Sequence, residues 1–202
     1  MTRDIFCGVV MDSGIVGPRR VSRRGLLIGA GAASAAILTA KTGLAATPRG
    51  NDGARWLWID SAWTGEKVKI TYYEDGRYVE DAMRALDHFM RDSRDNKVVA
   101  MDPRLYDLLF DLHRLMDGSN AFTLISGYRS PATNAMLAAR SRAVAKNSYH
   151  LRGWAADVRL QGRDLRQLAM GALSLHRGGV GMYSRKSNFI HVDTGPVRRW
   201  NI

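Results

Sequence analysis

The segment Ser148-Tyr-His150-Leu-Arg-Gly153-Trp-Ala155-Ala-Asp157 places an imidazole and a carboxylate a few residues apart. A second imidazole follows downstream in Phe189-Ile-His191-Val-Asp193. Neutral imidazole and carboxylate are ligands that zinc takes, and three protein ligands with one open position are the catalytic arrangement. The pattern therefore predicts a metal site made by His150, Asp157 and His191. Spacing alone leaves one alternative open, in which these are buried polar residues that satisfy backbone groups.

Three motifs surround and include this segment. They are Ile125-Ser-Gly-Tyr128-Arg129-Ser-Pro131-Ala-Thr-Asn134, the segment from Ser148 to Asp157, and Gly178-Gly-Val-Gly181 followed by His191-Val-Asp193-Thr-Gly195-Pro-Val-Arg198. In this order they make the region from about Arg55 to Trp200 resemble the YcbK-like (MepK-like) murein endopeptidases. That branch belongs to the D-Ala-D-Ala/VanX-type group of zinc metallopeptidases. The resemblance implies a hedgehog/D-Ala-D-Ala metallopeptidase-like fold, zinc as the cofactor and peptidoglycan as the partner.

Arg129 is the first candidate for a substrate contact. It follows an apolar run, 121–125, and precedes the helix start Ser130-Pro131, so it lies at a corner from which a side chain can project into a cleft. Its planar guanidinium suits a carboxylate or a developing oxyanion. The alternative is an arginine that only holds the corner by hydrogen bonds. The resemblance favours the substrate role, and Tyr128 and Ser148 are further candidates for substrate binding.

The general base of the resembled peptidases has no counterpart here. Relatives place a glutamate three residues before the last ligand or a histidine two residues before it, and this chain has Asn188 and Phe189 there. On a regular strand, Asp193 shares a face with His191, and this makes it the candidate base. Asp193 could equally orient an imidazole from behind, as carboxylates do for metal-bound histidines.

Two other residues remain possible bases, Tyr149 and His176. His176 ends an expected helix, where a cation is favoured without any ligand role. His88 and His113 fall within expected helices, away from ligand-type partners, and we expect both to be structural or surface residues.

The hydrophobic pattern predicts an α+β fold, a small mostly antiparallel sheet with helices packed on one side. Asp102-Pro103 and Ser130-Pro131 each combine a capping side chain with a proline at the first helical position. The expected strands are 56–59 and 68–72, which form a hairpin, then 121–125, 154–160, 180–183 and 188–193. The expected helices are 82–90, 103–116, 131–145 and 162–176.

Residues 1–46 have the composition of an export signal. Ser22-Arg23-Arg24-Gly25-Leu26-Leu27 opens a short, weakly apolar run, which is typical of a substrate of the twin-arginine export machinery. The alternative is an uncleaved membrane anchor. We expect residues 47–53 to be a flexible leader and residues 54–202 to be the zinc metallopeptidase-like catalytic domain. The only cysteine, Cys7, would be lost on processing, so the domain needs no disulfide.

The chain is basic, with a net charge of +11 over 202 residues. The export signal carries six Lys and Arg and two acidic residues, so the remainder retains +7. A polyanionic wall polymer suits this charge, whereas nucleic acid is opposed by the export signal and by the lack of a recognition motif. Together with this charge, the resemblance implies a periplasmic zinc-dependent endopeptidase that cuts murein peptide cross-links. The alternatives are a non-catalytic protein that binds metal and peptidoglycan, or a D,D-carboxypeptidase.

Overall fold

The computed structural model describes residues 53–141, 144–183 and 187–202. The described residues all belong to one compact unit, residues 46–202. The expected export signal and all but the last residue of the expected leader lie outside them. None of the helices in the described ranges is both long enough and apolar enough to cross a membrane.

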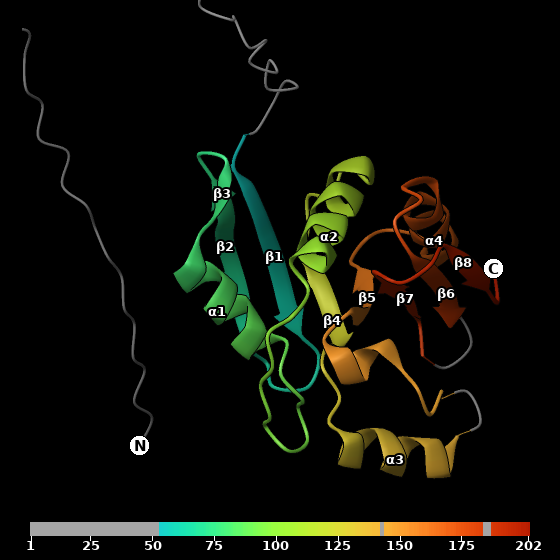
Figure 1. The fold of residues 1–202 in the computed structure, drawn as a ribbon. Helices are drawn as coiled ribbons and strands as arrows, with labels where there is room; N and C mark the ends of the chain where they lie inside the picture. Colours follow the sequence, from blue (N-terminus) through green and yellow to red (C-terminus); the bar gives the residue numbers. More distant parts are fainter. Residues whose placement is uncertain (1–52, 142–143, 184–186) are drawn as a thin grey trace, which may run out of the picture. The chain divides into compact units, whose positions relative to one another are not determined.

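The described part of the chain is built from short strands and helices (Figure 1). The strands are β1 (Arg55–Ser61), β2 (Lys67–Glu74), β3 (Arg77–Tyr78), β4 (Phe122–Ser126), β5 (Ala155–Leu160), β6 (Gly179–Tyr183), β7 (Phe189–Asp193) and β8 (Arg198–Trp200). The helices are α1 (Glu80–Phe89), α2 (Pro103–Leu115), α3 (Pro131–Arg140) and α4 (Leu165–Ser174), with a short 3-10 helix η1 (Tyr149–Arg152). Each strand and helix expected from the sequence has a counterpart among these elements.

All the strands form one sheet in the order β3-β2-β1-β4-β5-β7-β6-β8. Neighbouring strands are antiparallel except at β1–β4 and β6–β8, which are parallel. The prediction of an α+β fold with a mostly antiparallel sheet is therefore confirmed. The sequence pattern did not predict β3 and β8, because runs of two and three residues are too short to show alternation.

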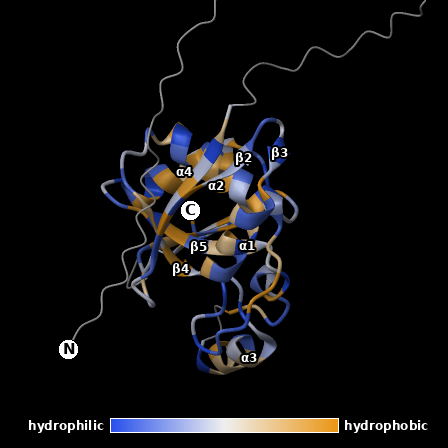
Figure 2. Ribbon diagram, turned by 90° about the vertical axis from the view of Figure 1, so that its left-hand side faces the viewer, coloured by the Kyte–Doolittle hydropathy of each residue, from blue (hydrophilic) through white to orange (hydrophobic). Residues whose placement is uncertain are grey.

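One face of the sheet carries the hydrophobic core. Apolar side chains alternate along the strands, as at Leu57 and Ile59 of β1 and Ile190 and Val192 of β7, and all four are at most 1% exposed. The buried apolar residues of α1, α2 and α4 belong to the same cluster, so these three helices cover that face. Figure 2 shows hydrophobic residues concentrated in the central strands, with α3 set apart from the sheet.

The capping residues predicted from the sequence start their helices as expected. The Asp102 carboxylate accepts a hydrogen bond from the Arg104 backbone N–H at 3.0 Å, and the Ser130 hydroxyl accepts one from Thr133 at 3.2 Å. Helix α3 ends at Arg140, earlier than the sequence pattern indicates. Ser130 thus fixes the start of α3 directly after Arg129.

Candidate metal centre

The sheet register brings two of the three expected ligands together. Asp157 of β5 lies directly opposite His191 of β7 in the antiparallel ladder. Their neighbours Val158 and Ile190 point into the core, so the Asp157 and His191 side chains point to the other face of the sheet. The alternation that buries the core thus also places an imidazole and a carboxylate side by side.

The third expected ligand, His150, reaches the same point from η1. The Ser148 hydroxyl caps this turn by accepting the His150 backbone N–H at 3.3 Å. The turn ends at Gly153, whose φ of 70° lies in the left-handed region that favours glycine. A side chain there would also be too close to the backbone, because a Cβ would lie 2.9 Å from the Ala100 carbonyl oxygen. His150 is 1% exposed, and its Nδ1 lies 2.6 Å from the Gly127 carbonyl oxygen.

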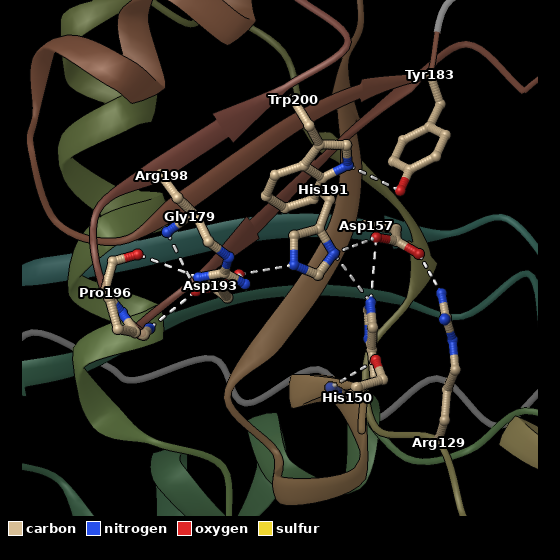
Figure 3. Close-up of polar contacts among 12 residues, drawn as sticks. Arg129, His150, Asp157, Gly179, Tyr183, His191, Asp193, Pro196, Arg198 and Trp200 are labelled. Atoms are coloured by element: carbon tan, nitrogen blue, oxygen red, sulfur yellow. Dashed lines mark hydrogen bonds and ion pairs between the residues drawn. The ribbon is translucent and has the colours of Figure 1, made fainter. Parts of the chain in front are cut away.

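Three polar atoms converge at the resulting centre (Figure 3). The Asp157 Oδ1 atom lies 3.0 Å from His191 Nδ1 and 3.2 Å from His150 Nε2, and the two ring nitrogens are 3.2 Å apart. Because a carbonyl can only accept, His150 Nδ1 must carry the proton in the neutral ring, which leaves a lone pair on Nε2. His191 Nε2 lies 2.9 Å from the Asp193 carboxylate, which likewise leaves a lone pair on Nδ1.

Three lone pairs that face one another at this distance repel unless a cation lies among them. A proton can be shared by only two of the atoms, whereas a metal ion can bind all three. Ligand atoms bound to tetrahedral zinc at 2.0–2.1 Å lie about 3.3 Å from one another. The observed separations of 3.0–3.2 Å match this closely, and His150, Asp157 and His191 form the one group of described residues with metal-ligand geometry.

Asp193 lies behind His191. It is fully buried, and it accepts hydrogen bonds from His191 Nε2, from the Gly179 and Gly195 backbone N–H groups and from both terminal nitrogens of Arg198. Of the two roles left open by the sequence, this geometry favours the orienting carboxylate, because its oxygens are directed at the back of the imidazole ring.

A second arginine contacts the proposed ligand Asp157. Arg129 donates through Nη2 to Asp157 Oδ2 and through Nε to the Ser126 hydroxyl at 2.8 Å. Because Oδ2 is engaged in this ion pair, Oδ1 is the oxygen available at the centre. Arg129 therefore fixes the rotation of the carboxylate, and it also lines the cleft described below.

Burial and the neighbouring charges determine the protonation of the three proposed ligands. Burial lowers the pKa of His150 below its ordinary value and so favours the neutral ring that a metal requires. Burial alone would raise the pKa of Asp157, but His150, His191 and Arg129 outweigh it and lower that pKa. Burial likewise opposes protonation of His191, yet hydrogen bonds to Asp157 and Asp193 raise its pKa.

The centre opens into a cleft of about 400 Å³ that is lined by residues far apart in sequence. Trp200 of β8 forms one wall, with its ring centroid 5.2 Å from that of His191. It fits there because Gly181, paired with both Trp200 and His191, has no side chain: a Cβ would lie 2.1 Å from the indole ring. The Trp200 indole N–H donates to the Tyr183 hydroxyl at 3.0 Å, and that hydroxyl has no other hydrogen-bond partner within the described ranges.

The remaining residues expected at the site are distributed differently. Ser148 and Tyr149 line the cleft, as does Arg129. Tyr128 is 8% exposed and packs in the hydrophobic core, so the geometry does not support a substrate contact for its ring. His176 lies exposed after α4 and does not line the cleft.

The sequence pattern did not identify Tyr183 and Trp200 as residues that line the cleft, or Arg198 as the partner of Asp193. Strand β8 pairs with β6, which brings Trp200 over His191 and Arg198 onto Asp193. The only signal in the sequence was an aromatic residue beside arginines downstream of the last ligand. That signal does not show which strand the tail pairs with.

Comparison with known proteins points to one family. The family model described as peptidoglycan L,D-endopeptidase MepK matches residues 49–200. The peptidoglycan L,D-endopeptidase MepK of Escherichia coli (strain K12) is 44% identical over 179 residues, which is 88% of this chain and 96% of that protein. The probable peptidoglycan L,D-endopeptidase MepK of Haemophilus influenzae is 45% identical over 138 residues, 68% of this chain and 74% of that protein. No solved structure matches the chain.

Proposed function

Because this chain belongs to the peptidoglycan L,D-endopeptidase MepK family, we propose that it is a zinc-dependent endopeptidase that hydrolyses peptide cross-links of peptidoglycan. The observation that carries the proposal is the convergence of His150 Nε2, Asp157 Oδ1 and His191 Nδ1 within 3.2 Å of one another. Relatives are named for L,D-endopeptidase activity, so the proposed scissile bond joins an L-configured to a D-configured residue.

The three ligands would hold zinc at the floor of the cleft, with the fourth position facing the substrate. When bound there, zinc lowers the pKa of water and polarises the scissile carbonyl. Two residues hold the histidine ligands in the tautomer that zinc binding needs. The Gly127 carbonyl holds the His150 tautomer, and Asp193 holds that of His191.

Arg129 has a supporting role and a proposed substrate role. Its Nε and Nη2 atoms are engaged by Ser126 and Asp157, but Nη1 has no acceptor among the described residues. Because Arg129 lines the cleft, Nη1 is available to a substrate carboxylate or to the oxyanion that develops at the scissile carbonyl. Ser148 lines the same cleft and is a further proposed substrate contact.

Tyr183 is the second proposed donor to the reacting carbonyl. Its oxygen accepts the Trp200 indole N–H at 3.0 Å, so its own proton must point away from the indole. In Figure 3 the hydroxyl is directed toward the side of the sheet on which Asp157 and His191 lie. A phenol held in this way can donate to the carbonyl oxygen as negative charge develops there.

The proposed place of action is the periplasm, reached through the twin-arginine export machinery. The paired arginines Arg23 and Arg24 before a weakly apolar run support this route. The substrate would be the peptide part of the wall polymer, whose carboxylates suit the basic chain.

One observation favours a second candidate function, a non-catalytic protein that binds metal and peptidoglycan. Asp157 is the only carboxylate among the described residues that line the cleft, and it is a proposed ligand. A general base of the kind found in the resembled peptidases is therefore not evident in the described part of the cleft.

Digestion of purified sacculi separates the two candidates. The zinc-loaded protein and His150→Ala are incubated with sacculi, and the released muropeptides are identified by mass. If the protein is an endopeptidase, cross-linked dimers should disappear with the unaltered protein. They should remain with His150→Ala and after the zinc is removed by a chelator. If the protein binds one zinc ion and co-sediments with sacculi yet releases nothing, the binding protein is the better description. Loss of a terminal D-alanine alone would indicate a carboxypeptidase.

A further inference from the structure

Three arginines line the cleft, and they differ in whether a carboxylate already neutralises them. Arg129 is paired with Asp157, and Arg198 is paired with Asp193 at 2.7 Å. Arg94 has no carboxylate partner in the described part of the chain. Its charge is therefore available to an anionic group that enters the cleft.

Trp63 lies beside Arg94 and is unusual in its exposure. It is 64% exposed, although an aromatic side chain of this size is ordinarily largely buried. The ring is nevertheless held in place, because its indole N–H donates to the Ile125 carbonyl at 2.7 Å. The Arg94 guanidinium lies over this ring, 5.8 Å from its centroid, at a distance where the ring attracts the cation.

Both residues are fixed to the segment that supports the proposed metal ligands. The buried Asp92 accepts the Arg94 backbone N–H at 2.9 Å through Oδ1 and the Ser130 backbone N–H at 2.8 Å through Oδ2. Ser130 follows Arg129, which contacts Asp157. Trp63 is fixed from the other side, since Ile125 precedes the Ser126 that accepts the Arg129 Nε–H. Trp63 and Arg94 are thus held at a set position relative to the metal centre.

We propose that Trp63 and Arg94 form a binding subsite for a free carboxylate of the cross-linked peptide, on a residue remote from the bond that is cut. This inference rests on the proposed function. The guanidinium binds the carboxylate through paired hydrogen bonds, and the open indole face packs against the aliphatic part of the same residue. The substrate class is therefore a peptide dimer with an unmodified carboxyl group at that position, and amidation of this group weakens binding.

The test compares two substrates and two proteins. Soluble cross-linked muropeptide dimers, with carboxyl groups either free or amidated, are given to the zinc-loaded protein and to Arg94→Gln. The dissociation constant is measured by calorimetry under conditions where cleavage is negligible, and KM and kcat are measured separately. Arg166→Gln removes the same charge from the exposed face of α4 and serves as the control.

We expect the unaltered protein and Arg166→Gln to bind the free dimer about tenfold more tightly than the amidated one, as for a hydrogen bond to a charged group. Arg94→Gln loses this preference and binds both dimers equally. Trp63→Leu retains part of the preference, because it removes the ring but leaves the guanidinium.

Two results would overturn the subsite: an unchanged preference in Arg94→Gln, or equal binding of both dimers by the unaltered protein. The same measurements test the proposed function separately from the subsite. Dimers that bind with the expected preference but are never cut would leave the subsite in place and refute the endopeptidase. A protein that binds neither dimer would refute both proposals.

Discussion

Asp157 and His191 face each other directly across the ladder between β5 and β7, with Asp157 Oδ1 3.0 Å from His191 Nδ1. Neither strand can shift by one residue against the other without turning its own member of this pair into the core, so the register that buries the core also fixes the pair. The distance between two proposed ligands is thus set by main-chain pairing rather than by side-chain flexibility.

Asp157→Asn should abolish tight zinc binding. The amide keeps the shape of the carboxylate but lacks its charge, and Arg129 is left without its partner in a buried position. Zinc affinity should fall by about 100-fold or more, since loss of a residue that only supports a ligand already costs about 10–100-fold. Competition with a chromogenic chelator measures this. Asp111→Asn, which alters a surface pair with Arg177, is the control and should bind zinc normally.

Asp193→Asn distinguishes an orienting residue from a base. If Asp193 orients His191, zinc affinity falls about 10–100-fold, and activity returns when zinc is added in excess. If Asp193 were the base, zinc would bind nearly normally and kcat would stay low at saturating zinc. Measurement of kcat against zinc concentration separates the two, and we expect recovery.

Tyr183→Phe should slow the reaction without weakening zinc binding. Removal of one donor to a developing oxyanion costs about 10²–10³ in kcat. Trp200→Phe keeps an aromatic wall beside His191 but removes the N–H that orients the hydroxyl, so its effect should be smaller. Zinc content and thermal unfolding of both variants serve as controls. A kcat for Tyr183→Phe within twofold of the unaltered protein would remove Tyr183 from the mechanism.

Asp102→Asn should destabilise the fold at neutral pH and lose its effect in acid. Burial alone would raise the pKa of Asp102, but hydrogen bonds from Arg104 and from the Thr194 hydroxyl at 2.7 Å lower it. A lowered folded-state pKa gives stability that is present above the unfolded value of about 3.9 and is lost as the pH falls through the folded-state pKa.

Asparagine also caps helices well, so the loss for Asp102→Asn should be about 1 kcal/mol at pH 7. The difference in unfolding free energy from the unaltered protein should shrink as the pH falls below about 4. Urea unfolding at several pH values measures this difference. Asp164→Asn is the matched control, because Asp164 makes a cap hydrogen bond to Gln167 and should tolerate the change at each pH.

Local pattern was enough to predict the main elements and the convergence of the three proposed ligands. Strand alternation predicts the face of the sheet on which Asp157 and His191 each lie, and the short motifs contain the imidazole and carboxylate side chains that a metal needs. It could not predict which way Asp193 is directed, because that depends on Arg198 from β8. It also could not predict the Trp63 and Arg94 subsite, because long-range hydrogen bonds position its parts. These run from Trp63 to Ile125 and from Ser130 to the Asp92 that holds Arg94.

Gly153 and Gly181 have no functional group, yet the centre depends on both. The space a side chain would need is taken by the Ala100 carbonyl in one case and by the Trp200 ring in the other. In a saturation library selected for activity, both positions should therefore tolerate as few replacements as His150 does. Substitution is thus restricted at two residues that have no side chain to contact the substrate. The absence of a side chain at each of them leaves space for a neighbouring group that shapes the centre.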